Sequence, residues 1–129
     1  MTSYRFDHIH LISPNPVKAA EFYEKVFDAK RTKVSELKDG RTMVNLDLNG
    51  LSIGIYNLKP GQKPAPKSVE TGYGLDHFGL VVDNIEAAVA KVKASGCKFG
   101  DEITPFSPTL KLAFFWGPDN VLIELIERS

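Results

Sequence analysis

The sequence lacks the features of a secreted, membrane-spanning or nucleic-acid-binding protein. Cys97 is the only cysteine, which excludes an internal disulfide and suits a reducing cytoplasm. Acidic and basic side chains balance to a formal net charge of zero, so neither nucleic acid nor an anionic membrane is an expected partner. No apolar run approaches the ~20 residues that span a bilayer, and the first residues lack the layout of a secretion signal. We expect a cytoplasmic protein with one domain, residues 1–129, that acts on a small molecule.

Histidine is also scarce, and its placement is the most informative feature of the chain. The three histidines lie in two copies of one short pattern, DHIHL at residues 7–11 and DHFGL at residues 76–80. The closing apolar segment, residues 120–126, contains a single carboxylate, that of Glu124. Two imidazoles and one carboxylate on separate strands are the ingredients of a divalent metal site.

The repeat continues beyond the histidines. Each pattern predicts a strand, then a turn, then an amphipathic helix that ends near residue 27 or 95. Asn15 is the expected N-cap of the first helix, and Asp83 or Asn84 that of the second. Three strand-like stretches follow each helix, at about 30–37, 42–48 and 51–58 in the first half, and at about 97–103, 110–116 and 120–126 in the second. We therefore expect module one at about 4–58, a linker at about 59–72 and module two at about 73–128.

Alternation along the strands predicts which side chains share a face, because successive side chains point to opposite sides of a sheet. One set is apolar and should face the helices. The opposite set mixes polar, aromatic and small residues: His8, His10, Asn45, Asp47, Ser52, Gly54, Tyr56, His77, Gly79, Lys111, Phe115 and Glu124. If the sheet curves, this second face lines a cleft for a ligand; if it does not, the face simply meets water.

These motifs together resemble the vicinal oxygen chelate superfamily. The resemblance rests on the repeated D-H-[I/F]-x-L strand, the helix containing F-Y-x-x-V-F at residues 22–27, and the closing segment G-P-D-N-x-x-I-E-L. It covers residues 6–127. It implies an α+β fold in which tandem βαβββ modules form a curved, eight-stranded mixed sheet around a metal-holding cleft.

The resemblance also implies a ligand set. His8, His77 and Glu124 match the family's metal ligands, whereas Gly54 stands where many relatives carry a fourth ligand. Two imidazoles and one carboxylate leave positions open for a substrate with two adjacent oxygens. Iron, manganese, nickel, magnesium or zinc would suit such a site, and no organic cofactor is expected.

Several residues of the mixed face are candidates for the chemistry around the ion. His10, Tyr56 and Asp47 are the candidate catalytic groups, because each can donate or accept a proton. Asn45, Lys111 and Phe115 are candidate substrate-binding residues. Asp7 and Asp76 should point to the other face by strand alternation, so we expect them to fix local strand or turn geometry.

Three functions are compatible with these residues. The first is a metal-dependent lyase or isomerase of the glyoxalase kind, which moves a proton next to a carbonyl. The second is an iron-dependent dioxygenase, for which the same three ligands are suited. The third is a metal-free protein that sequesters a drug or metabolite, against which the retained His8, His77 and Glu124 argue. We expect a homodimer, with the modules either within one chain or exchanged between chains.

Overall fold

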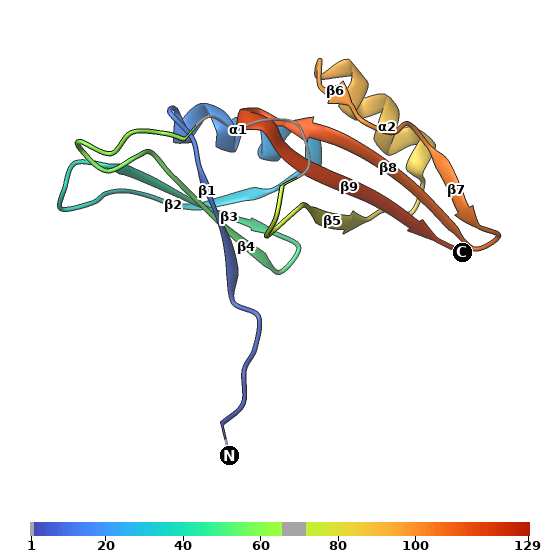
Figure 1. Cartoon of the computed structure of the whole chain (residues 1–129), viewed down its shortest axis with the longest axis horizontal. Helices are drawn as coiled ribbons and strands as arrows, with labels where there is room; N and C mark the ends of the chain where they lie inside the picture. The colour runs from blue at the N-terminus through green and yellow to red at the C-terminus, as the bar shows by residue number, and fades with distance from the viewer. Residues whose placement is uncertain (1, 66–71) are drawn as a thin grey trace. The chain divides into compact units, whose positions relative to one another are not determined.

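The computed structural model describes residues 2–65 and 72–129 and divides the chain into two units, Met1–Ala65 and Pro66–Ser129 (Figure 1). The boundary falls inside the predicted linker, of which residues 66–71 lie outside the described residues. No helix in the described part of the chain is long and apolar enough to span a membrane.

The first unit contains one helix and a mixed sheet. Its elements are β1 (His8–Ile12), α1 (Pro16–Phe27), β2 (Lys30–Glu36), β3 (Thr42–Leu48) and β4 (Leu51–Tyr56). The sheet order is β1-β4-β3-β2. Strand β1 pairs with β4 in parallel, and the other pairs are antiparallel, so the first and last strands of the unit lie side by side.

The second unit repeats this arrangement with one change. Its elements are β5 (Phe78–Val81), α2 (Ile85–Ala94), β6 (Lys98–Phe99), β7 (Thr104–Ser107), β8 (Leu110–Gly117), the short 3-10 helix η1 (Pro118–Asn120) and β9 (Val121–Arg128). Strand β5 pairs in parallel with β9, β9 pairs with β8, and β6 and β7 both pair with β8.

The prediction of one strand over residues 97–103 is wrong, because only the short strand β6 lies in that range and β7 begins after it. Between them, backbone hydrogen bonds join Gly100 to the Phe114 carbonyl and Phe114 to the Asp101 carbonyl, outside regular pairing. The Trp116 ring lies so close that a Cβ added to Gly100 would be 3.0 Å from it. The α+β class and the repeated strand-helix-strands order are nevertheless confirmed.

The helix starts follow from local side-chain chemistry. The Lys18 backbone N–H donates to Asn15 Oδ1 at 3.1 Å, and the Ala87 N–H donates to Asn84 Oδ1 at 3.0 Å. Each asparagine thus satisfies a backbone donor that has no partner inside its helix. The predicted N-cap Asn15 is confirmed, and Asn84 rather than Asp83 is the cap of α2.

Each unit buries its own apolar core between its helix and its sheet. Helix α1 contacts β3 and β4, and α2 contacts β8 and β9. Of the side chains that alternation predicts for the helix-facing side of β3, β4 and β9, Leu51 and Val121 at the strand starts are only half-buried. The others are buried: Val44, Leu46, Leu48, Ile53, Ile55, Ile123 and Leu125. The polar face of each sheet is therefore the face that its helix leaves uncovered.

Candidate metal and substrate site

In the first unit, the strand register gathers the predicted polar residues on one face of the sheet. His8 pairs with Ser52 and His10 with Gly54 across β1 and β4. Asn45 and Asp47 lie opposite Gly54 and Ser52 across β3 and β4. Because directly paired residues share a face, these side chains stand together with Tyr56 on the side away from α1.

The two histidines that begin the repeats are held in the same way. His8 Nδ1 lies 2.6 Å from Asp7 Oδ2, and His77 Nδ1 lies 2.8 Å from Asp76 Oδ2. A carboxylate on Nδ1 favours a proton on that nitrogen and leaves the Nε2 lone pair for another partner, as in histidines that bind metals.

This contact corrects the expectation that Asp7 and Asp76 point away from the histidines. Strand β1 begins at His8 and β5 begins at Phe78, so both aspartates precede regular strand structure. Alternation does not apply to backbone outside a strand, and each carboxylate instead turns back onto the neighbouring imidazole.

The second unit brings two of the three predicted metal ligands together. His77 Nε2 lies 3.8 Å from Glu124 Oε2, a separation too long for a hydrogen bond. Glu124 stands opposite Gly79 across β5 and β9, and the Phe114 ring meets the His77 ring edge-on with centroids 4.9 Å apart. His8, the third predicted ligand, belongs to the first unit. Within neither unit, over the residues that the structure describes, do three His, Cys, Asp or Glu side chains gather into a metal-binding group.

His10 packs closely in the first unit. Its ring centroid lies 3.8 Å from that of Tyr56 and 6.3 Å from that of His8. Its Nε2 is buried and has no hydrogen-bond partner among the described residues. Burial, with smaller contributions from the positive charges of His8 and Arg41, lowers the pKa of His10 below its ordinary value of 6.5. The neutral imidazole is therefore favoured.

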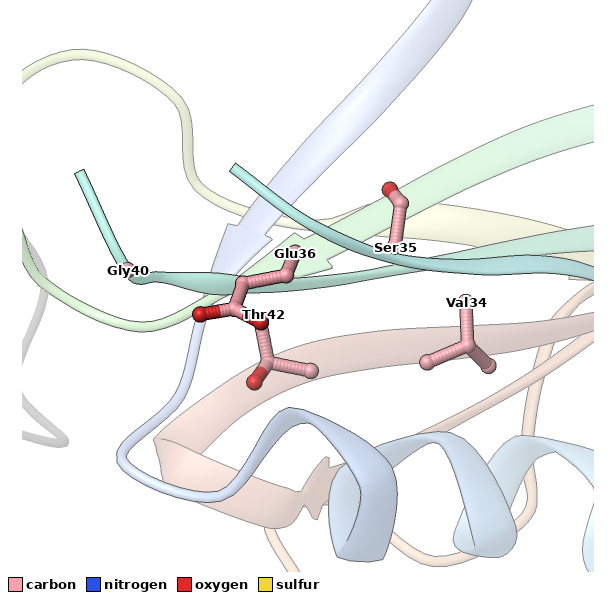
Figure 2. Close-up of a pocket in the computed structure, with 5 residues that line it drawn as sticks. All are labelled: Val34, Ser35, Glu36, Gly40 and Thr42. Atoms are coloured by element: carbon pink, nitrogen blue, oxygen red, sulfur yellow. The ribbon is translucent and has the colours of Figure 1, made fainter. Parts of the chain in front are cut away.

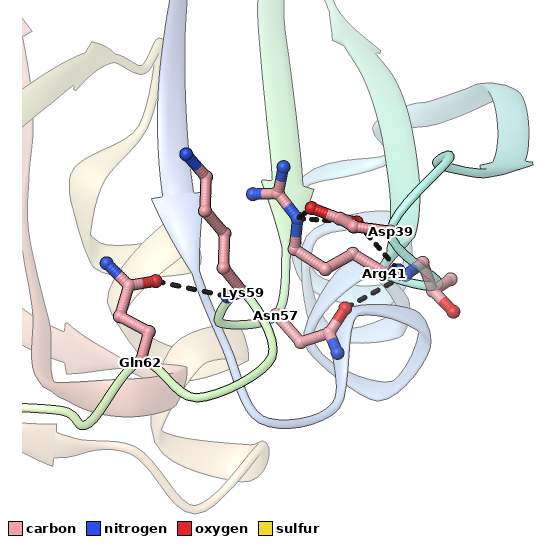
Figure 3. A network of polar contacts seen from close by, with 6 residues as sticks. Asp39, Arg41, Asn57, Lys59 and Gln62 are labelled. Carbon is pink, nitrogen blue, oxygen red and sulfur yellow. Dashed lines mark hydrogen bonds and ion pairs between the residues drawn. The ribbon is translucent and has the colours of Figure 1, made fainter.

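Arg41 supports this cluster and was not foreseen from the sequence. Its guanidinium lies 4.3 Å from the Tyr56 ring centre, and its Nε donates to Asp39 at 2.9 Å (Figure 3). The mutual contact lowers the pKa of Asp39 and raises that of Arg41. The Asn57 side chain, labelled in Figure 3, accepts the Thr42 backbone N–H at 2.9 Å, which links the start of β3 to the residue after β4. The Asp39-Gly40 turn signal was visible in the sequence, but the partner of the guanidinium was not.

Two predicted substrate-binding residues lie on the wrong face. Phe115 is fully buried, pairs with Ile123 across β8 and β9, and contacts the Phe99 ring in the core. Lys111 Nζ lies 3.0 Å from Glu86 Oε1 of helix α2. The prediction that Phe115 and Lys111 share a face with Glu124 is therefore wrong. Phe114, paired with Glu124, occupies that face instead.

The shallow pocket in Figure 2 is a separate feature, at the β2–β3 hairpin. It is lined by Val34, Ser35, Glu36, Gly40 and Thr42. These residues include no candidate ligand or catalytic group from the sequence, and Glu36 is the ionisable side chain among them. The pocket therefore offers no convergent set of polar groups for chemistry.

The sequence is similar to a known protein family and to two known proteins. The model of the glyoxalase/bleomycin resistance protein/dioxygenase superfamily matches residues 5–125. A lactoylglutathione lyase of Schizosaccharomyces pombe is 27% identical over 145 residues, which cover 100% of the chain and 47% of the relative. A probable chloroplastic lactoylglutathione lyase of Arabidopsis thaliana is 38% identical over 61 residues, covering 46% of the chain and 17% of the relative. The chain thus spans about half the length of the first relative, or less in the second case.

Solved structures share the fold across almost the whole chain. A glyoxalase family protein from Bacillus cereus has a TM-score of 0.86 at 14% identity, covering 99% of this chain and 96% of that one. A glyoxylase/bleomycin resistance protein/dioxygenase domain from Frankia sp. EAN1pec has a TM-score of 0.81 at 18% identity, covering 99% and 94%. The fosfomycin resistance protein FosX from Listeria monocytogenes, solved with Mn(II) and sulfate, has a TM-score of 0.73 at 21% identity, covering 99% and 95%.

Proposed function

Because this chain belongs to the glyoxalase/bleomycin resistance protein/dioxygenase superfamily, we propose that it is a metal-dependent lyase or isomerase of the glyoxalase kind. A small substrate would bind through two adjacent oxygens, and a proton would move at the carbon next to a carbonyl. The observation that carries this proposal is the paired arrangement of Asp76, His77 and Glu124, in which an oriented imidazole nitrogen and a carboxylate oxygen face each other without a hydrogen bond.

The residues present fit a divalent ion. Glu124 and the Nε2 atoms of His77 and His8 would hold it, the last two oriented by Asp76 and Asp7. We also propose that the protein is a homodimer. Imidazole and carboxylate suit iron, manganese, nickel or zinc, and the Mn(II) of the FosX relative supports manganese as the first ion to test. When bound, the ion supplies positive charge that stabilises negative charge on a substrate oxygen.

The proton chemistry falls to the chain's own side chains. His10 is favoured in its neutral form, so its imidazole has a free lone pair that can accept a proton. Tyr56 packs against His10 and can donate from its phenol, whereas Asp47 lies opposite Ser52, two residues along β4 from the Gly54 that pairs with His10. We propose that the base comes from these three residues and that Asn45, opposite Gly54, orients the substrate.

Metal content is the first test. Protein purified without added ions should contain close to one transition-metal ion per complete site, and His77→Ala and Glu124→Gln should lose it. Glu102→Gln is the matched control, because Glu102 pairs with Lys93 at the surface of the same unit. Equal metal content in all four proteins, or none in the parent, would refute the metal site.

Turnover then separates the candidate reactions. The similarity to lactoylglutathione lyases supports the hemithioacetal of glutathione and methylglyoxal as the first substrate to assay. Oxygen uptake with catechols, and no hemithioacetal turnover, would favour the dioxygenase instead. Sedimentation tests the dimer, which a mass equal to one chain would contradict.

A further inference from the structure

In each unit a polar side chain lies opposite a glycine across the pair formed by the first and last strands. The polar residue is on the first strand in one unit and on the last strand in the other. In the second unit Glu124 of the last strand pairs with Gly79 of the first strand. In the first unit His10 of the first strand pairs with Gly54 of the last strand. Gly79 is the repeat counterpart of His10, and Gly54 is the counterpart of Glu124. The position of a proposed metal ligand in one unit is thus bare backbone in the other.

Each glycine leaves room that its neighbour uses. A Cβ added at Gly54 would lie 2.6 Å from His10 Nδ1 and 2.8 Å from His10 Cε1, and both distances are shorter than the contacts that Cβ atoms make in proteins. At Gly79 the nearest atom would be Glu124 Oε1 at 3.0 Å, the end of a more flexible side chain. The imidazole of His10 therefore lies directly over the Gly54 backbone, where any larger residue would have to project.

The His10 ring cannot easily move aside. Tyr56 packs on it, and the Arg41 guanidinium, itself held by Asp39, lies 4.3 Å from the centre of the Tyr56 ring. His10 Nε2 is left buried without a hydrogen-bond partner among the described residues. An orphaned buried nitrogen costs stability, and a bound group that pairs with it would remove that cost.

We infer that the His10–Gly54 pair determines which substrates the site accepts: His10 closes the position where a second carboxylate would stand, and its Nε2 contacts an oxygen of the bound substrate. This rests on the proposed function, because it places His10 beside the ligand His8. An imidazole at this point favours substrates whose chelating oxygens carry negative charge, since a second carboxylate there would repel them. One more coordination position also stays open for the substrate.

The packing part is tested by thermal unfolding. Gly54→Ala should lower the Tm by roughly 5 °C or more in the parent, because it overpacks a fixed ring. In a His10→Gly background the same change should cost less than about 2 °C. Gly72→Ala is the control, because no atom lies within 4 Å of its added Cβ. An equal cost of Gly54→Ala in both backgrounds would overturn the arrangement.

The binding part uses Mn²⁺ and acetohydroxamate, which chelates metal ions through two adjacent oxygens. His10→Phe keeps a ring over Gly54 but removes Nε2, so it should weaken acetohydroxamate about tenfold more than it weakens Mn²⁺. His10→Gly/Gly54→Glu places a carboxylate at the closed position, so it should bind Mn²⁺ at least tenfold more tightly and acetohydroxamate more weakly than the parent. Tighter acetohydroxamate binding by this double variant would overturn the inference.

The outcomes separate this inference from the proposed function. If the parent binds Mn²⁺, His77→Ala does not, and His10→Phe binds acetohydroxamate as the parent does, then the metal site stands and the role of His10 is refuted. If the parent binds no Mn²⁺ and contains no transition metal as purified, the proposed function and the binding role of His10 are refuted together, and the Gly54→Ala unfolding test still decides the packing part.

Discussion

The aspartates that precede the two histidines give a graded prediction about metal affinity. Removing the outer partner of a metal-bound histidine typically costs 10- to 100-fold in affinity. Asp76 is 50% exposed and its partner His77 30%, whereas Asp7 is 90% exposed and His8 53%. Because solvent screens the more exposed pair, Asp76→Ala should cost close to 100-fold, about 2.7 kcal/mol, and Asp7→Ala close to tenfold, about 1.4 kcal/mol.

Isothermal titration of the metal-free protein with Mn²⁺ measures both losses directly. Asp76→Asn adds a test of charge, because the amide oxygen still accepts a hydrogen bond; it should fall between the parent and Asp76→Ala. Asp101→Ala, an exposed aspartate of the second unit, is the control and should bind as the parent does. The reasoning is refuted if Asp76→Ala matches this control, or if Asp7→Ala causes the larger loss.

Three further predictions concern stability. Phe115→Ala should lower the free energy of unfolding in urea by about 3–5 kcal/mol, and Phe114→Ala by clearly less, because only Phe115 is fully buried; equal losses would contradict the register of β8. In the metal-free protein the lowered pKa of His10 means that the unfolded state binds more protons than the folded state between that pKa and 6.5. The free energy of unfolding should therefore fall as the pH drops below about 6.5, and it should fall less in His10→Phe. Parallel pH profiles of the two proteins would argue against a buried neutral ring. Mn²⁺ at 100 times its Kd should raise the unfolding free energy by about 2.7 kcal/mol in the parent, a gain that EDTA reverses; the same gain in Glu124→Gln would place the ion elsewhere.

Local chemistry made much of the fold predictable. The repeated strand-turn-helix pattern, the caps Asn15 and Asn84, and the turn signals depend on neighbouring residues, which a sequence displays directly. Asn49 and Gly50, for example, both adopt positive φ, 49° and 94°, as a tight hairpin of this composition requires. Alternation in β3, β4 and β9 was likewise readable, because one face of each strand is uniformly apolar.

The facing of β8 could not be read in the same way. Its register against β9 depends on the turn at η1, where Asp119 and Asn120 both have positive φ. A shift of one residue moves every side chain to the other face, and β8 offers aromatic residues on both faces, so composition does not decide. The contacts of His10 with Gly54 and of Arg41 with Tyr56 could not be predicted from the sequence either. Each joins residues that are far apart in the chain, and only the pairing register brings them together.

Because each unit has its own core between helix and sheet, the sequences of the two units can diverge independently. A substitution inside one interior needs compensation only among its own neighbours, so two copies of an ancestral half-length gene could drift apart without either losing its shape. The two units differ in this way at their parallel strand pairs: the glycine is on the last strand in the first unit and on the first strand in the second. Separate cores permit such a difference to arise.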